Sequence, residues 1–194
     1  MSDRFAYLVV DSKRFSFPRL ADDMARYDVS LTNPATGLIT ALSLEGDEQP
    51  VLRPDLETAI VRGQKTTFQL WIGEGDDLVC EIRPRGPLVT EWYSFANPGH
   101  ETSRLVRLFL RRFDTVGESG GLVLGVLDIE GSTAEFEWDA FPRQPESIPT
   151  GPSLIALTEE NAKAVVAPSG YRRMRRGGLV LWVAEKYVQY AINH

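Results

Sequence analysis

The stretch TTFQLWIGEGDDLVCEIRPRGPLVTEWYSF, residues 66–95, decides the fold class of this chain. Its apolar and aromatic residues alternate with polar ones, which is the pattern of half-buried β-strands. Three such segments, 66–73, 77–83 and 88–95, are separated by a short Gly-containing triplet and by a corner that holds two prolines. Connections this short join antiparallel neighbours. The stretch therefore predicts three antiparallel strands in chain order.

Helical patterns flank these strands. The strongest is 97–113, in which Asn97 can cap the helix, Pro98 fits its first turn and apolar residues recur along one face. Shorter helix candidates lie at 16–28 and 54–63. Because the strand patterns come in runs instead of alternating with helices, the sequence predicts an α+β protein. We expect a mainly antiparallel sheet of about six to eight strands, with helices packed on one face.

The length of 194 residues favours a single domain, 1–194. Residues 142–152 contain four of the twelve prolines and form a candidate internal boundary. Beyond it, segment 153–194 reads as strand, helix, basic loop, strand and short helix. It is too short for a secure independent domain, so we expect it to pack on the main sheet.

Composition narrows the functional classes. The net charge of −6 argues against a nucleic-acid footprint that covers the whole domain, and favours solubility or a basic protein partner. The start, MSDRFAYLVV, lacks the pattern of a signal peptide. No apolar run approaches the roughly 20 residues that span a membrane. We therefore expect a cytoplasmic protein that does not enter the membrane.

Acidic residues gather around AEFEWDA, residues 134–140. A turn at Gly131 would make this segment a strand, with its acids on one face and with Gly125 leaving room for the indole of Trp138. Such a row of carboxylates can face water, attract a basic partner, hold a metal ion or catalyse hydrolysis. The candidate residues are Asp128, Glu135, Glu137 and Asp139.

Basic and aromatic residues supply the other candidate contacts. The run YRRMRRGG, residues 171–178, can bind a protein or a phosphate backbone, or can balance nearby acids. Trp71 lies on the strand face opposite Phe68 and Leu70, and can anchor an interface if that face is open. The arginines of the run are Arg172, Arg173, Arg175 and Arg176, and a helical stripe of Arg104, Arg107 and Arg111 can add to them.

Motifs for catalysis or cofactor binding do not stand out. His100 and His194 lack the spacing of zinc ligands, and Cys80 lies on an apolar strand face. The Gly-rich segment 117–121 precedes a strand, whereas phosphate-binding loops open a helix. The sequence therefore predicts no metal, no cofactor and no catalytic residue, and favours a binding protein over an enzyme.

Two segments carry a family resemblance. RLVRLFLRRFD (104–114) and EFEWDAF (135–141), in this order, resemble pieces of small bacterial α+β immunity-type proteins associated with polymorphic toxins. The resemblance implies stoichiometric inhibition of a cognate toxin, often by an acidic surface that covers a basic active site. We therefore favour a non-enzymatic protein-binding module that sequesters a toxin or another basic partner.

Two alternatives stay open. One is a hydrolase or metal-dependent enzyme that uses the strand carboxylates. The other is a regulatory or assembly protein that binds nucleic acid or protein through the C-terminal Arg patch. The identity of the partner and the oligomeric state do not follow from the sequence.

Overall fold

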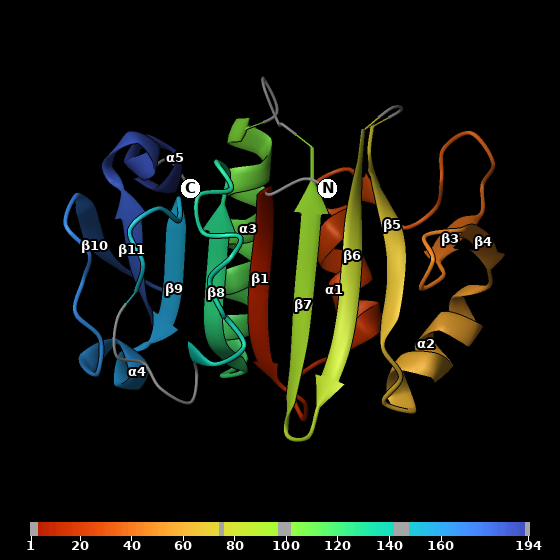
Figure 1. Ribbon diagram of the computed structural model, residues 1–194, viewed down its shortest axis with the longest axis horizontal. Helices are drawn as coiled ribbons and strands as arrows, with labels where there is room; N and C mark the ends of the chain where they lie inside the picture. The colour runs from red at the N-terminus through yellow and green to blue at the C-terminus, as the bar shows by residue number, and fades with distance from the viewer. Residues whose placement is uncertain (1–3, 74–75, 97–101, 142–147, 193–194) are drawn as a thin grey trace.

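The computed structural model describes residues 4–73, 76–96, 102–141 and 148–192, and these form an α+β fold around one antiparallel sheet (Figure 1). The described residues contribute 11 strands to it. The strands are β1 (Arg4–Asp11), β2 (Val29–Ser30), β3 (Ile39–Leu42), β4 (Glu48–Val51), β5 (Thr66–Ile72), β6 (Asp76–Arg85), β7 (Leu88–Phe95), β8 (Leu122–Asp128), β9 (Leu154–Thr158), β10 (Tyr171–Arg176) and β11 (Leu179–Ala184).

The sheet runs in the order β10-β11-β9-β8-β1-β7-β6-β5-β3-β4, and β2 pairs with β5 beside this path. Every pairing is antiparallel. The predicted meander is confirmed as β5, β6 and β7, in which Phe68 lies opposite Cys80 and Cys80 opposite Tyr93. The C-terminal segment extends the same sheet, because β9 pairs with β8.

Four helices bury their apolar sides against one face of the sheet, which we call the helical face. They are α1 (Phe17–Ala25), α2 (Arg53–Val61), α3 (Thr102–Glu118) and α5 (Val188–Ile192). The expected stripe on α3 is buried, from Leu105 through Phe109 and Phe113 to Val116. A short 3-10 turn, η3 (Glu185–Tyr187), precedes α5, and the proposed cap at Asn97 lies outside the described residues.

The opposite face, which we call the outer face, has its own smaller core. Phe5, Tyr7 and Val9 of β1 lie there with residues of β8, β9 and β11. The short helix α4 (Glu159–Lys163) and the chain around Trp138 cover this half. None of the helices among the described residues lies in front of the outer face over β7, β6 and β5 (Figure 1).

The strand count is larger than the predicted six to eight, and β10 explains part of the difference. We expected a basic loop there, yet Tyr171–Arg176 pairs along its whole length with β11. Charged residues are typical of edge strands, because they discourage pairing with another chain. Among the described helices, none is long and apolar enough to cross a membrane.

Candidate binding cleft on the outer face

The segment expected to form an acidic strand, 134–140, is instead a series of turns. Asp128, at the end of β8, is fully buried and explains the difference. Its carboxylate accepts hydrogen bonds from the backbone N–H groups of Glu130 (3.1 Å), Gly131 (2.9 Å) and Thr133 (2.8 Å), and from the hydroxyl of Thr133 (2.7 Å). A side chain that accepts these bonds favours a turn over a strand ladder.

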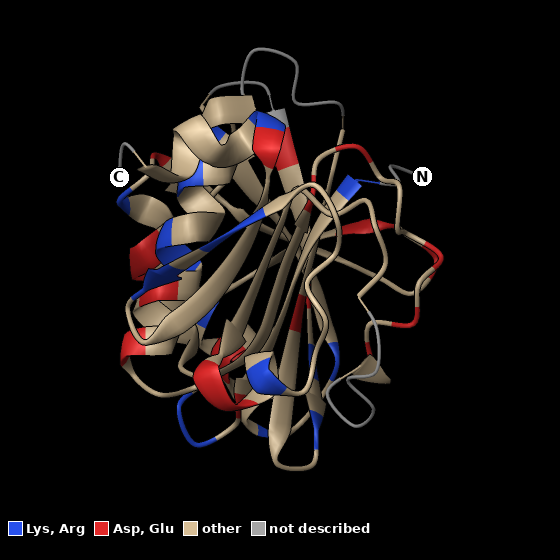
Figure 2. Cartoon of the chain, turned by 90° about the vertical axis from the view of Figure 1, so that its left-hand side faces the viewer, with Lys and Arg blue, Asp and Glu red and all other residues tan. Residues whose placement is uncertain are grey.

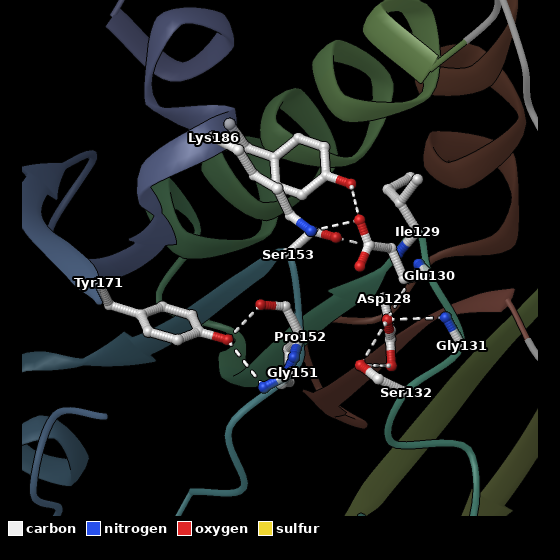
Figure 3. A network of polar contacts seen from close by, with 11 residues as sticks. Asp128, Ile129, Glu130, Gly131, Ser132, Gly151, Pro152, Ser153, Tyr171 and Lys186 are labelled. Atoms are coloured by element: carbon white, nitrogen blue, oxygen red, sulfur yellow. Dashed lines mark hydrogen bonds and ion pairs between the residues drawn. The ribbon is translucent and has the colours of Figure 1, made fainter. Parts of the chain in front are cut away.

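A second group of polar contacts ties this turn to the C-terminal strands (Figure 3). Glu130 accepts from Lys186 and, at 3.3 Å, from the hydroxyl of Tyr187. The hydroxyl of Tyr171 donates to the carbonyl of Pro152 (2.5 Å) and accepts from the N–H of Gly151 (3.1 Å). Residues 129–141, which we call the covering segment, are therefore tied near their start to Lys186 and Tyr187, while Tyr171 holds the neighbouring chain at Gly151 and Pro152.

The predicted role of Gly125 is also wrong. A Cβ atom at Gly125 would lie 2.9 Å from the ring of Phe113 on α3, so this glycine makes room on the helical face. Trp138 lies on the outer face, buried against the ring of Phe141. The hairpin that would have paired Gly125 with Trp138 does not form, because the chain turns at Asp128.

A cleft of about 600 Å³ lies between the covering segment and the open part of the outer face. Its floor contains Trp92, which stacks on Phe5 with ring centroids 4.5 Å apart. Its side is formed by Phe136, which packs at 4.6 Å against Trp138. The remaining lining residues are Tyr7, Glu81, Arg83, Arg85, Thr90, Ala134, Glu137, Asp139 and Ala140.

Most charges in the cleft neutralise one another. Asp139 accepts from the hydroxyl of Tyr7 at 2.5 Å and from Arg85 at 2.6 Å. Burial, and then the hydrogen bond to Asp139, raise the pKa of Tyr7, so this phenol stays protonated. Glu81 pairs with Arg83 and, at 2.7 Å, with Lys65. The arginines of the cleft are therefore held by acids of the chain itself.

Three of the four candidate acids are exposed, and two of these, Glu135 and Glu137, differ from the paired Asp139. Glu137 lines the cleft and Glu135 precedes it on the same turn, and both are exposed. Within the described parts of the chain neither forms an ion pair. The structure thus places Glu137 and Asp139 in one cleft, leaves Glu135 on the adjacent surface and separates Asp128 from them as a buried anchor.

The C-terminal arginines form a strand whose charges are largely paired. Arg172 pairs with Glu185 (3.2 Å), Arg175 with Glu159 (2.9 Å) and Arg176 with Asp114 (2.6 Å), while Arg173 is exposed. Figure 2, which looks onto this side of the molecule, shows basic segments interleaved with acidic ones. These pairings reproduce the alternative in which the arginines balance nearby acids.

Trp71 lies on the open part of the outer face, where Ser30 of β2 is its neighbour in the sheet. The indole is half-buried, and its N–H is buried without an acceptor among the described residues. The expectation that Trp71 faces away from Phe68 and Leu70 agrees with their burial in the helical-face core. Whether Trp71 contacts a partner stays a prediction.

Sequence reasoning missed a buried charge cluster on the helical face. Arg112 donates to both oxygens of Glu91, at 2.6 and 3.2 Å, and to Asp23 at 2.8 Å. The hydroxyl of Tyr93 donates to Glu91 at 2.6 Å. The sequence does contain a pattern that indicates this cluster. Arg112 falls on the apolar stripe of its helix, and Glu91 lies on the same face of β7 as the buried Tyr93.

Among the described residues, no group of three or more His, Cys, Asp or Glu side chains is placed to hold a metal ion. Comparison of the chain with protein-family models, curated protein sequences and solved structures gives no match.

Proposed function

We propose that this protein is a non-enzymatic binding module that captures a basic protein partner at the cleft. The observation that carries the proposal is a pair of exposed carboxylates, Glu135 and Glu137, which form no ion pair with the described residues and lie beside the aromatic floor of the cleft. A lysine or arginine of the partner can place its alkyl chain against Trp92 and its charge near Glu137. Aromatic faces and carboxylates together favour such cations.

The resemblance to immunity-type proteins is in line with this location. Its second segment, 135–141, belongs to the covering segment that forms one side of the cleft. Under this proposal the partner is a toxin whose basic active site is blocked by the acidic turn. The net charge of −6 would speed the encounter with such a partner at low ionic strength.

The alternatives have weaker support. Hydrolysis by two carboxylates needs two available acids in one cleft, yet of the acids that line this cleft Glu81 and Asp139 are paired with cations of the chain, which leaves Glu137. Nucleic-acid binding through β10 needs free arginines, yet three of its four are paired with acids. We therefore place the partner at the cleft.

The test uses the full chain as bait in lysate of its native cell, followed by purification of the captured protein. Binding of that protein is then measured by calorimetry. We expect the double reversal Glu135→Lys/Glu137→Lys to weaken binding at least tenfold, since it replaces two attractive charges with two repulsive ones. The matched control is Glu45→Lys/Glu160→Lys, which reverses two exposed acids away from the cleft.

Circular dichroism should show both variants folded, because all four side chains are exposed. If the cleft variant binds the captured protein as tightly as the wild type, the cleft is not the interface. If both double variants lose affinity equally, the attraction depends on net charge alone, and the proposed site is wrong.

A further inference from the structure

A group of arginines that the proposed function does not use surrounds a small pocket on the other side of the sheet. The pocket has a volume of about 340 Å³. We call it the arginine pocket, and its lining residues are Arg26, Tyr27, Arg107, Arg111 and Arg176. They come from the end of α1, from the solvent side of α3 and from β10, so the fold itself brings these charges together.

The walls of the pocket are held by hydrogen bonds. Arg104 donates to the backbone carbonyls of Tyr27 and Asp28, each at 3.1 Å. Asp28 itself has a positive φ of 56°, a conformation that non-glycine residues rarely adopt. On the other side, Arg176 is fixed by Asp114 through its Nε at 2.6 Å and donates to the carbonyl of Ala191 at 3.3 Å. These contacts place two walls around the central pair of arginines.

The central pair is Arg107 and Arg111, and the acid near it, Asp114, interacts with the charge of Arg111 but forms its ion pair with Arg176. Arg107 and Arg111 are one helical turn apart on α3, and neither forms an ion pair within the described parts of the chain. Arg107 makes a 3.4 Å contact with the hydroxyl of Ser103, and Arg26 reaches Asp23 only at 3.6 Å. Asp23 is already the partner of buried Arg112. Two guanidinium groups one helical turn apart on the same helix repel each other, and an anion bound between them would offset that repulsion.

We propose that the arginine pocket binds a small phosphate-bearing ligand of the polyphosphate type, such as a diphosphate or a nucleotide. Guanidinium groups match phosphate oxygens through paired, charge-assisted hydrogen bonds. The volume lies within the range of small-molecule sites, at its lower end, and suits a compact anion.

The inference does not depend on the proposed function. The cleft lies on the outer face, whereas α1 and α3 lie on the helical face. In Figure 1 both helices are behind the sheet and the covering segment is in front of it. A ligand in the arginine pocket therefore leaves the cleft accessible, and either proposal can fail alone.

The experiment is calorimetric titration of the full chain with inorganic pyrophosphate in metal-free buffer at low ionic strength. Inorganic phosphate, ATP and adenosine are the comparison ligands. We expect pyrophosphate and ATP to bind, phosphate to bind more weakly and adenosine not to bind. The double variant Arg107→Gln/Arg111→Gln should weaken pyrophosphate binding about 100-fold, or about tenfold for each charged hydrogen-bonding group.

A matched control removes the same charge elsewhere. Arg62→Gln/Arg173→Gln neutralises two exposed arginines outside the pocket and should keep wild-type affinity. The proposal fails if pyrophosphate and ATP show no binding at millimolar concentration. It also fails if the pocket variant binds like the wild type, or if the control variant loses as much affinity as the pocket variant. ATP that binds far more tightly than pyrophosphate would identify a nucleotide, with its base near Tyr27, as the ligand.

Discussion

The buried charge cluster makes a strong prediction for the variant Arg112→Met. Methionine keeps an unbranched, apolar stem like that of arginine but is shorter and lacks the guanidinium group. Glu91 and Asp23, which are 0% and 5% exposed, would lose their cationic partner inside the protein. Breaking a buried ion pair from one side costs about 3–5 kcal/mol, because a charge is left uncompensated away from water. A typical domain is stable by only about 5–15 kcal/mol.

The assay is urea unfolding followed by tryptophan fluorescence, together with thermal unfolding. For a chain of this size, about 3–5 kcal/mol corresponds to a fall in Tm of roughly 6–20 °C.

A second variant separates charge from shape. Asp23→Asn/Glu91→Gln/Arg112→Met removes all three charges and keeps the shapes of the two acidic side chains, so it should recover at least half of the lost stability. The reasoning is refuted if Arg112→Met costs less than about 1 kcal/mol, which is the range of an exposed ion pair. It is equally refuted if the neutral triple variant is as unstable as the single one.

Two further predictions concern packing and pH. Gly125→Ala should destabilise the protein by about 1–3 kcal/mol in urea unfolding, since its Cβ would overlap the buried ring of Phe113; an unchanged midpoint would contradict the close contact. The hydrogen bond from Lys186 lowers the pKa of Glu130 from its ordinary value of 4.5, so its stabilising effect is present above that pH and is lost as the pH falls through the lowered pKa. Glu130→Gln should therefore flatten the dependence of Tm on pH between about 5 and 3, and an unchanged slope would count against the ion pair.

The meander could be predicted because alternation, turn residues and burial agree there. In 66–95 each apolar row faces the helical-face core and each connection is short, so local and tertiary preferences point to the same structure. Segment 134–140 has the same alternation and is not a strand. Its conformation is decided by Asp128, whose carboxylate captures the backbone donors that follow it. Periodicity cannot report such a competing interaction.

The sequence predicted only part of the candidate site, because the rest depends on contacts between residues that are distant in the chain. Glu137 and Asp139 could be identified from their charge alone. That Asp139 is paired while Glu137 stays available depends on Tyr7 and Arg85, which contact Asp139 and are distant from it in sequence. The arginine pocket likewise combines the end of α1 with α3 and β10. Contacts between residues so distant in sequence depend on the order of the strands in the sheet. Local sequence patterns define this order less well than any other part of the fold.

The distribution of unpaired charge links the two proposals. Arginines and acids pair extensively along β10 and in the cleft, so the exposed charges that remain unpaired at the two sites are negative beside the covering segment and positive on α3. Exposed charges are screened over about 8 Å at physiological ionic strength, and the two sites lie on opposite faces of the sheet. Each site should therefore attract its ligand without weakening the other. It follows that the acidic reversal Glu135→Lys/Glu137→Lys should leave pyrophosphate affinity unchanged at physiological salt, so the two sites serve as controls for each other.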